Sequence, residues 1–181
     1  MLRPTPRTMI PPRKSRTIHV RRLAIGGSAP IAVQSMAATQ TRDVAATLRQ
    51  VRILEAAGAD LIRIAVDSAA DVDALAQIRA QTQALLSVDL QENYRLAAKV
   101  APYVDKIRYN PGHLHHHEKE RGVAEKVAFI VDVAREHGCA LRIGINAGSI
   151  APEYKQRFGA DHVGAIVACA VEHCRLVAEL G

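Results

Sequence analysis

The sequence predicts an α/β fold with parallel strands, a partial (β/α) barrel of the TIM type. Apolar strand patterns alternate with amphipathic helix patterns along most of the chain. Each predicted strand keeps one polar face, whereas the central strands of an open doubly wound sheet are apolar on both faces. No G-x-G-x-x-G motif follows the first strand, which argues against a dinucleotide-binding fold. Polar side chains that converge from successive strands are typical of a barrel interior.

The bulk composition indicates one globular domain in a reducing compartment. The chain has 181 residues, of which 49% are hydrophobic, with two Phe, four Tyr and no Trp. No apolar run reaches the length of a membrane span, and no signal-peptide pattern follows the start. The three cysteines form no CxxC pair and no even disulfide set. We therefore expect a cytoplasmic protein without a membrane partner.

The amino-terminal residues are basic and rich in proline. Residues 1–22 contain seven Lys or Arg residues, four prolines and no acid, and they contribute to the net charge of +6. We expect residues 1–16 to be a disordered basic tail and residues 17–181 to be the barrel domain. Aromatic side chains for base stacking are scarce, so the sequence does not favour nucleic-acid binding.

A short hairpin and then a repeating pattern of strands and helices follow the tail. The hairpin is predicted at residues 17–20 and 23–25 and ends at Gly26-Gly27. The predicted strands, each with an apolar and a polar face, are 31–36, 61–66, 85–90, 106–110 and 141–149. The predicted helices, with apolar residues at helical spacing, are 43–57, 71–80, 94–100, 122–137 and 162–180. Gly58 and Gly138 are natural helix ends.

This pattern supplies about five of the eight units that a complete barrel needs in about 250 residues. The chain ends at Gly181, directly after a predicted helix. We therefore expect an incomplete barrel with an open edge.

Three arginines on the polar faces of three strands are the main candidates for a binding site. If the sheet curls, Arg63, Arg108 and Arg142 face a common space. Two like charges 4 Å apart repel by about 4 kcal/mol at an effective dielectric constant near 20, so the cluster needs carboxylates or a bound anion. Asp89 offers one internal partner. The remaining charge indicates a phosphate or diphosphate ligand, with ion pairing to acids or exposure at the rim as the alternative.

Two asparagines and two glycines accompany these arginines. Asn110 and Asn146 follow Arg108 and Arg142 by even numbers of residues, which places them on the same strand faces. Their amides could orient phosphate oxygens or cap the following turns. Asp89 could act as a general acid or base, but pairing with an arginine is favoured. The glycines at positions 144 and 148 would let a ligand or a neighbouring strand approach closely.

The histidines and cysteines do not predict a metal site. His113, His115, His116 and His117 lie in one loop, and adjacent positions cannot all aim at one ion, so a solvated loop over the barrel mouth is favoured. Cys139, Cys169 and Cys174 are expected to be buried small apolar side chains. No pair of nucleophile and base stands out, so no catalytic residue is predicted.

Several motifs, in order, resemble the amino-terminal barrel of the 4-hydroxy-3-methylbut-2-enyl diphosphate synthase family. They are Lys14-Ser15-Arg16 and residues 30–36 (PIAVQSM), 54–60 (LEAAGAD), 108–112 (RYNPG) and 142–149 (RIGINAGS). The resemblance implies an iron–sulfur enzyme of the non-mevalonate isoprenoid pathway. Such an enzyme reductively opens 2-C-methyl-D-erythritol 2,4-cyclodiphosphate to an allylic diphosphate. It implies substrate-diphosphate binding by Arg63, Asp89, Arg108, Asn110, Arg142 and Asn146, with Asp89 in the polar wall.

The resemblance also implies parts that this chain does not contain. In the family, a carboxy-terminal domain holds a [4Fe-4S] cluster through three cysteines and a glutamate, flavodoxin or ferredoxin supplies electrons, and the enzyme is a homodimer. The three cysteines of this chain do not match the cluster motif, so we assign them no iron. Two departures from the family pattern are Gln91, where the family commonly has a histidine, and His113, where it has an asparagine.

Three hypotheses follow. The first is the diphosphate-binding barrel of this synthase, inactive without its carboxy-terminal part. The second is a non-redox phosphate-binding barrel, such as a lyase or a pterin-type transferase. The third is a degenerate, non-enzymatic fragment that pairs its open edge with another chain.

Overall fold

The computed structural model describes residues 15–181, and most of the predicted basic tail lies outside them. In chain order, the strands and α-helices are β1 (Ile18–Val20), β2 (Leu23–Ile25), β3 (Gln34–Met36), α1 (Val44–Ala56), β4 (Leu61–Val66), α2 (Ala69–Arg79), β5 (Leu86–Leu90), α3 (Ala97–Val100), β6 (Lys106–Tyr109), α4 (Val123–His137), β7 (Ala140–Ile143), α5 (Pro152–Phe158) and α6 (His162–Leu180). Short 3-10 turns are η1 (Tyr94–Leu96), η2 (Ala101–Tyr103), η3 (Pro111–His113) and η4 (Ala147–Ser149).

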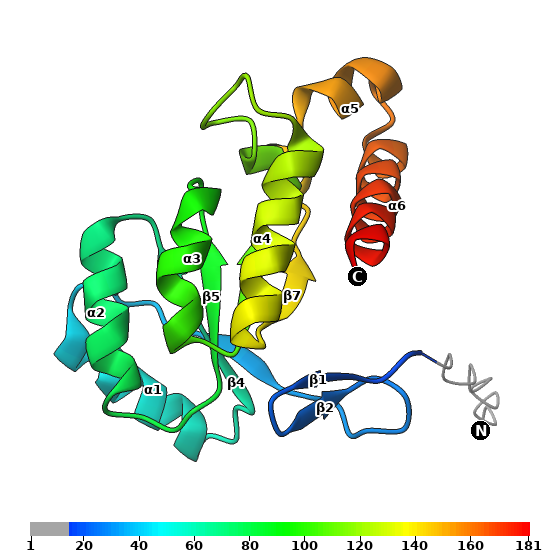
Figure 1. The fold of residues 1–181 in the computed structure, drawn as a ribbon. Helices are drawn as coiled ribbons and strands as arrows, with labels where there is room; N and C mark the ends of the chain where they lie inside the picture. The colour runs from blue at the N-terminus through cyan, green and yellow to red at the C-terminus, as the bar shows by residue number, and fades with distance from the viewer. Residues whose placement is uncertain (1–14) are drawn as a thin grey trace, which may run out of the picture.

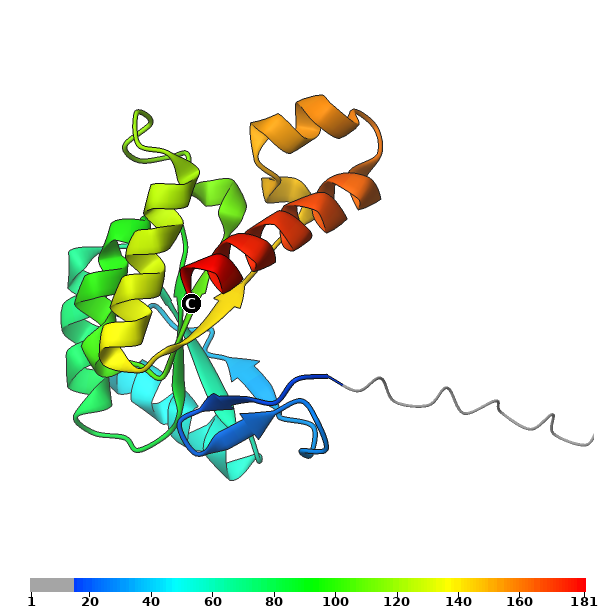
Figure 2. The same cartoon turned by 45° about the vertical axis from the view of Figure 1, so that its right-hand side comes forward.

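The centre of the fold is a five-stranded parallel sheet in the order β3-β4-β5-β6-β7, with α1, α2, α3 and α4 along one face (Figure 1). Helix α6 packs against α4 and β7. The antiparallel hairpin β1–β2 lies at one end of the sheet, away from α5 (Figure 2). The predicted α/β class, parallel strands, hairpin and partial barrel are confirmed.

The sheet curls, as predicted for a partial barrel. Lys106 Nζ on β6 donates a hydrogen bond to Gln34 Oε1 on β3 at 2.6 Å, although β4 and β5 lie between these strands. In a flat sheet, three strand spacings would separate β3 from β6 by about 14 Å. The polar faces therefore line a concave inner surface.

The two faces of each strand differ as predicted. Ile62, Ile64 and Val66 of β4 are buried in the core cluster beneath the helices, whereas Arg63 points to the inner surface. Strands β5 and β6 repeat this arrangement, with Val88 and Ile107 in the same core. Burial of the apolar faces against α1–α4 stabilises the sheet. Because this packing uses only one face, the inner face can carry polar groups.

Capping contacts account for the observed helix ends, and the predicted end at Gly138 is confirmed. Asp43 accepts a hydrogen bond from the backbone N–H of Ala46 and begins α1. Helix α4 ends at Gly138, which adopts a left-handed conformation with φ of 64°. Helix α2 begins at Ala69, two residues earlier than predicted, because Ser68 and Asp71 form a capping box.

Two predicted strands are shorter than expected. The strand predicted at 31–36 is a ladder only from Gln34, because the backbone of Val33 bonds to the carboxylate and N–H of Asp60 instead. The strand predicted at 141–149 ends at Ile143. The reason lies in its neighbour: β6 ends at Tyr109, and Pro111, which has no N–H, turns that chain away. Helix α5 was not predicted.

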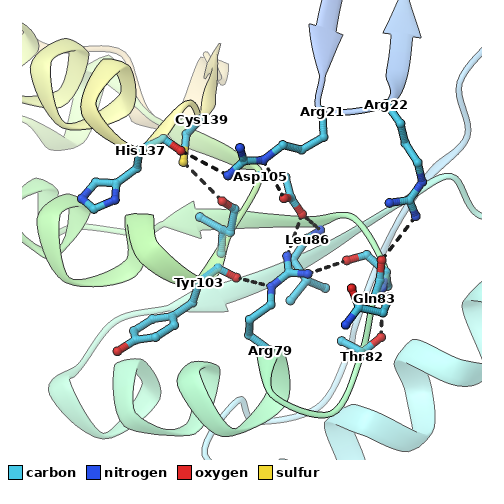
Figure 3. Close-up of polar contacts among 12 residues, drawn as sticks. Arg21, Arg22, Arg79, Thr82, Gln83, Leu86, Tyr103, Asp105, His137 and Cys139 are labelled. Atoms are coloured by element: carbon cyan, nitrogen blue, oxygen red, sulfur yellow. Dashed lines mark hydrogen bonds and ion pairs between the residues drawn. The ribbon is translucent and has the colours of Figure 1, made fainter.

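A polar cluster joins the hairpin to the end of the sheet at which the strands begin (Figure 3). The Asp105 carboxylate accepts hydrogen bonds from Leu86 N at 2.8 Å, Arg79 Nη2 at 2.6 Å and Arg21 Nε at 3.3 Å. Arg21 lies in the hairpin turn and also donates to the His137 carbonyl at the end of α4. The Asp105 carboxylate therefore links the hairpin, α2 and β5 at this end of the sheet. In (β/α) barrels the active site lies at the opposite end, where the strands terminate.

Candidate functional site

A cavity of about 490 Å³ on the inner surface contains five of the six predicted site residues. They come from β4, β5, β6, β7 and the segment after β7: Arg63, Asp89, Arg108, Arg142 and Asn146. Gln91, one of the two family departures, also lines it. The cavity lies toward the carboxyl ends of the strands, where (β/α) barrels place their active sites.

Asp89 neutralises part of the charge by pairing with two arginines. Its Oδ1 accepts a hydrogen bond from Arg108 Nη1 at 2.6 Å, and its Oδ2 lies 3.7 Å from Arg63 Nε. The Arg63 guanidinium also contacts the Met36 sulfur at 3.1 and 3.2 Å, a weak acceptor. Asp89 therefore has the role of arginine partner that the sequence favoured over acid–base catalysis.

Arg142 differs from Arg63 and Arg108 in having no contact with Asp89. Within residues 15–181, no carboxylate forms an ion pair with it. It is exposed and lies directly beside Arg108 in the parallel ladder, at a strand spacing of about 4.8 Å. Three guanidinium groups and one carboxylate line the cavity and leave two positive charges, an arrangement that favours a dianion.

Gly144 allows Arg108 to reach Asp89. A Cβ at position 144 would lie 2.0 Å from Arg108 Nε and 2.5 Å from its Cζ, closer than any real contact. Gly144 was predicted to allow the close approach of either a ligand or a neighbouring strand. In the structure, the group that approaches it is the Arg108 side chain from the neighbouring strand β6. Apart from its chain neighbours, no atom of residues 15–181 lies within 4 Å of a Cβ built at Gly148.

Asn110 does not line the cavity. It is 2% exposed, accepts a hydrogen bond from Gly112 N at 3.0 Å and donates one to Ser149 Oγ at 2.7 Å. It therefore caps the turn after β6, which was the alternative role, and its contact with substrate stays a prediction. Asn146 is exposed on the cavity wall beyond the end of β7.

Lys106 is a charged inner residue that the sequence analysis did not single out. It is 6% exposed, and burial, followed by the charges of Arg142 and Arg63, lowers the pKa of its amine to about 8. The available signal was its position two residues before Arg108, on the same face of β6.

The two departures from the family pattern contact each other beside the site. His113 Nδ1 is hydrogen-bonded to the Gln91 carbonyl. Lys126, which is 1% exposed, donates to the carbonyls of Leu114 at 2.7 Å and His117 at 2.6 Å. Lys126 of α4 thus anchors the loop of residues 113–121, called the histidine loop below.

The described residues do not fit an iron–sulfur cluster. No group of three or more His, Cys, Asp or Glu side chains within residues 15–181 is arranged to hold a metal ion. Cys139 bonds weakly to the carbonyls of Ala101 and Val104, Cys169 is fully buried, and Cys174 is exposed. Burial raises the pKa of the Cys139 and Cys169 thiols to about 11, which disfavours the thiolates that a cluster needs. Cys169 is thus buried as predicted, whereas the exposure of Cys174 contradicts its predicted burial.

No helix in the described part of the chain is long and apolar enough to cross a membrane.

The chain is similar to bacterial enzymes named 4-hydroxy-3-methylbut-2-en-1-yl diphosphate synthase (flavodoxin). It is 52% identical over 168 residues to the protein of Rhodopirellula baltica, an alignment that covers 92% of this chain and 44% of the relative. The protein of Acidithiobacillus ferrooxidans is 42% identical over 169 residues, with 93% and 44% covered. The chain thus spans less than half the length of these relatives.

A solved structure, "Yersinia pestis DHPS with pterine-sulfa conjugate Compound 16", aligns with a TM-score of 0.49 and 17% identity, over 86% of this chain and 60% of that one. This likeness is too weak to bear on function.

Residues 15–181 match the family described as "GcpE TIM-barrel domain". The match covers all the residues that form the curled sheet, its helices and the arginine-lined cavity. The chain therefore belongs to the GcpE TIM-barrel domain family.

Proposed function

We propose that this chain is the diphosphate-binding barrel part of a 4-hydroxy-3-methylbut-2-en-1-yl diphosphate synthase. The complete enzyme would be an oxidoreductase of isoprenoid biosynthesis that reductively opens 2-C-methyl-D-erythritol 2,4-cyclodiphosphate. The observation that carries this proposal is Arg142, which lies beside Arg108 in the cavity without a carboxylate partner among the described residues. The names and identities of the relatives support the same substrate class.

Each residue would have a distinct part in binding. Arg142 would bind phosphate oxygens with both arms of its guanidinium, and Arg63 would add a second cation from β4. Asp89 would hold Arg108 in place, so that the rigid pair presents one guanidinium edge to the ligand. The Asn146 amide would orient an oxygen without adding charge, and Asn110 would fix the neighbouring turn.

The reductive step would need parts outside these residues. The [4Fe-4S] cluster expected for the complete enzyme would supply the electrons for ring opening, but the cysteines of this chain do not fit it. Flavodoxin or ferredoxin as the electron donor and a homodimeric assembly belong to the proposal for the whole protein, and the names of the relatives support flavodoxin. We place the protein in a reducing cytoplasm, in keeping with its three free cysteines.

Calorimetric titration of the 181-residue chain with 2-C-methyl-D-erythritol 2,4-cyclodiphosphate tests the proposal. We expect saturable binding that Arg142→Met weakens by about tenfold or more, since a charged hydrogen bond contributes about 1.5–3 kcal/mol. Arg175→Met, which removes an exposed cation from α6, is the matched control and should leave affinity unchanged. Binding of another phosphorylated compound, without heat from the cyclodiphosphate, would favour a non-redox phosphate-binding barrel instead.

A further inference from the structure

Lys106 lies on the inner surface behind the arginine-lined cavity. Its amine donates to Gln34 Oε1 across the concave side of the sheet at 2.6 Å. Gln34, Lys106 and Arg142 form the polar end of a second cavity, of about 480 Å³, whose other walls include Ile18, Ile25 and Leu61. Arg142 lines both cavities, so it joins Lys106 to the anion site.

The polar groups around Lys106 are not fully used within the protein. The ammonium group has three N–H donors, and among the described residues only Gln34 accepts from it. Ser87, directly opposite Lys106 in the β5–β6 ladder, is fully buried, and its Oγ has no hydrogen-bond partner in residues 15–181. A buried hydroxyl without a partner is costly, so this part of the inner surface keeps an unused polar group beside Lys106.

Four other charged side chains share the inner surface with Lys106, and Arg142 and Arg63 act on its amine most strongly. Arg63 lies on β4, Asp89 on β5, Arg108 on Lys106's own strand, and Arg142 on β7. Gln34 and Ser87 are neutral. Asp89 is engaged by Arg108 and Arg63, so no free carboxylate among the described residues balances the Lys106 charge.

We propose that Lys106 is a positioning residue of the anion site whose charge is linked to ligand binding. A bound dianion holds the proton on the Lys106 amine, whereas the free site loses this proton more readily as the pH rises above neutral. The charged amine in turn attracts the dianion from a position behind Arg142 and Arg63. This inference rests on the anion site of the proposed function and adds to it that, in mildly alkaline solution, an organic diphosphate binds with uptake of a proton.

The charges around the Lys106 amine in the unliganded site support this linkage. Burial and the two neighbouring guanidinium groups bring the pKa of the amine to about 8, within reach of physiological conditions. A dianion in the cavity opposes both guanidinium charges and raises that pKa, so protonation and binding favour each other.

Sulfate is a suitable probe because it stays a dianion across the whole range. Its affinity for the 181-residue chain would be measured by calorimetry at about pH 7 and about pH 9, at constant ionic strength. We expect wild-type affinity to be about tenfold lower at the higher pH, since one unit of pKa difference corresponds to a factor of about ten. Lys106→Met should bind more weakly at about pH 7 and lose the pH dependence. Lys106→Arg keeps a permanent charge, so it should retain affinity and also lose the pH dependence.

The outcomes separate this inference from the proposed function. If the wild type binds sulfate and the cyclodiphosphate while Lys106→Met keeps the wild-type affinity and pH dependence, the linkage is wrong and the anion site stands. If the wild type binds no sulfate at about pH 7, the anion site and the linkage both fail. Loss of folding in Lys106→Met, checked by circular dichroism, leaves Lys106→Arg as the deciding variant, because a purely structural lysine would retain wild-type pH dependence there.

Discussion

The guanidinium of Arg108 lies directly over Gly144, where a Cβ would be 2.0 Å from its Nε. This contact lets Arg108 cross the neighbouring strand and bond to Asp89 at 2.6 Å. The geometry of the proposed anion site therefore depends on the absence of a side chain at position 144.

Gly144→Ala should displace Arg108 and weaken anion binding. Because the methyl group overlaps a buried side chain, we also expect a loss of about 1–3 kcal/mol in the free energy of unfolding. Calorimetry and urea unfolding would measure the two effects. Gly148→Ala is the control and should change neither, because its Cβ would meet no atom within 4 Å in the described part of the chain beyond its sequence neighbours. Wild-type affinity in Gly144→Ala would show that Arg108 need not occupy this position.

Asp105→Asn should destabilise the fold without affecting the site. The carboxylate accepts from Leu86 N and pairs with Arg79 and Arg21, and the substitution leaves buried donors unsatisfied (Figure 3). We expect the free energy of unfolding, measured in urea, to fall by about 2–4 kcal/mol. Arg21 contributes little to this loss because its side chain is half exposed. The exposed pair of Asp132 and Arg135 provides the comparison: Asp132→Asn should cost less than about 0.5 kcal/mol. Equal effects of the two substitutions would argue against the Asp105 network.

Stability should fall in mild acid, in part through His173. This histidine is 4% exposed beside the Tyr109 hydroxyl, and burial lowers its pKa. Below about pH 6.5, the ordinary pKa of histidine, the unfolded chain binds more protons at this site than the folded chain. The contribution of His173 is therefore fully present above that pH and is lost as the pH falls toward its folded-state pKa.

His173→Gln should reduce the difference in unfolding free energy between about pH 8 and about pH 5, measured in urea. The exposed His19, changed to Gln, serves as the control and should leave the difference as in the wild type. An unchanged pH dependence in His173→Gln would mean that this group titrates alike in both states.

Lys126→Met should loosen the histidine loop. The buried ammonium donates to the carbonyls of Leu114 and His117, and its loss removes the donor that both share among residues 15–181. We expect a loss of about 2–3 kcal/mol in stability and faster proteolytic cleavage within residues 113–121. Lys119→Met, at an exposed loop position, should show neither effect. Unaltered cleavage in Lys126→Met would show that other contacts hold the loop.

The sequence predicted the inner face well because strand alternation is local. Arg63, Asp89, Arg108 and Arg142 each follow from their parity within a strand, and a curled sheet brings them together. The pairing of Asp89 with arginine likewise followed from charge alone, because a lone carboxylate among three cations has few other partners.

What the sequence could not predict depends on contacts between distant segments. The end of β7 is set by the end of β6, and the direction of the Asn110 amide is set by Gly112 and Ser149. Lys106 was missed because a lysine at the start of a strand usually reaches solvent, and only the curl of the sheet buries it against Gln34.

The most direct test of the proposed anion site is nuclear magnetic resonance of the arginine Nε–Hε groups during titration with 2-C-methyl-D-erythritol 2,4-cyclodiphosphate. The resonances of Arg63, Arg108 and Arg142 should shift together and saturate at the calorimetric affinity. Those of Arg21 and Arg79, bound to Asp105 at the opposite end of the sheet, should stay in place. Shifts confined to Arg21 and Arg79, or saturable binding without movement of the Arg142 resonance, would contradict a diphosphate site on the inner surface.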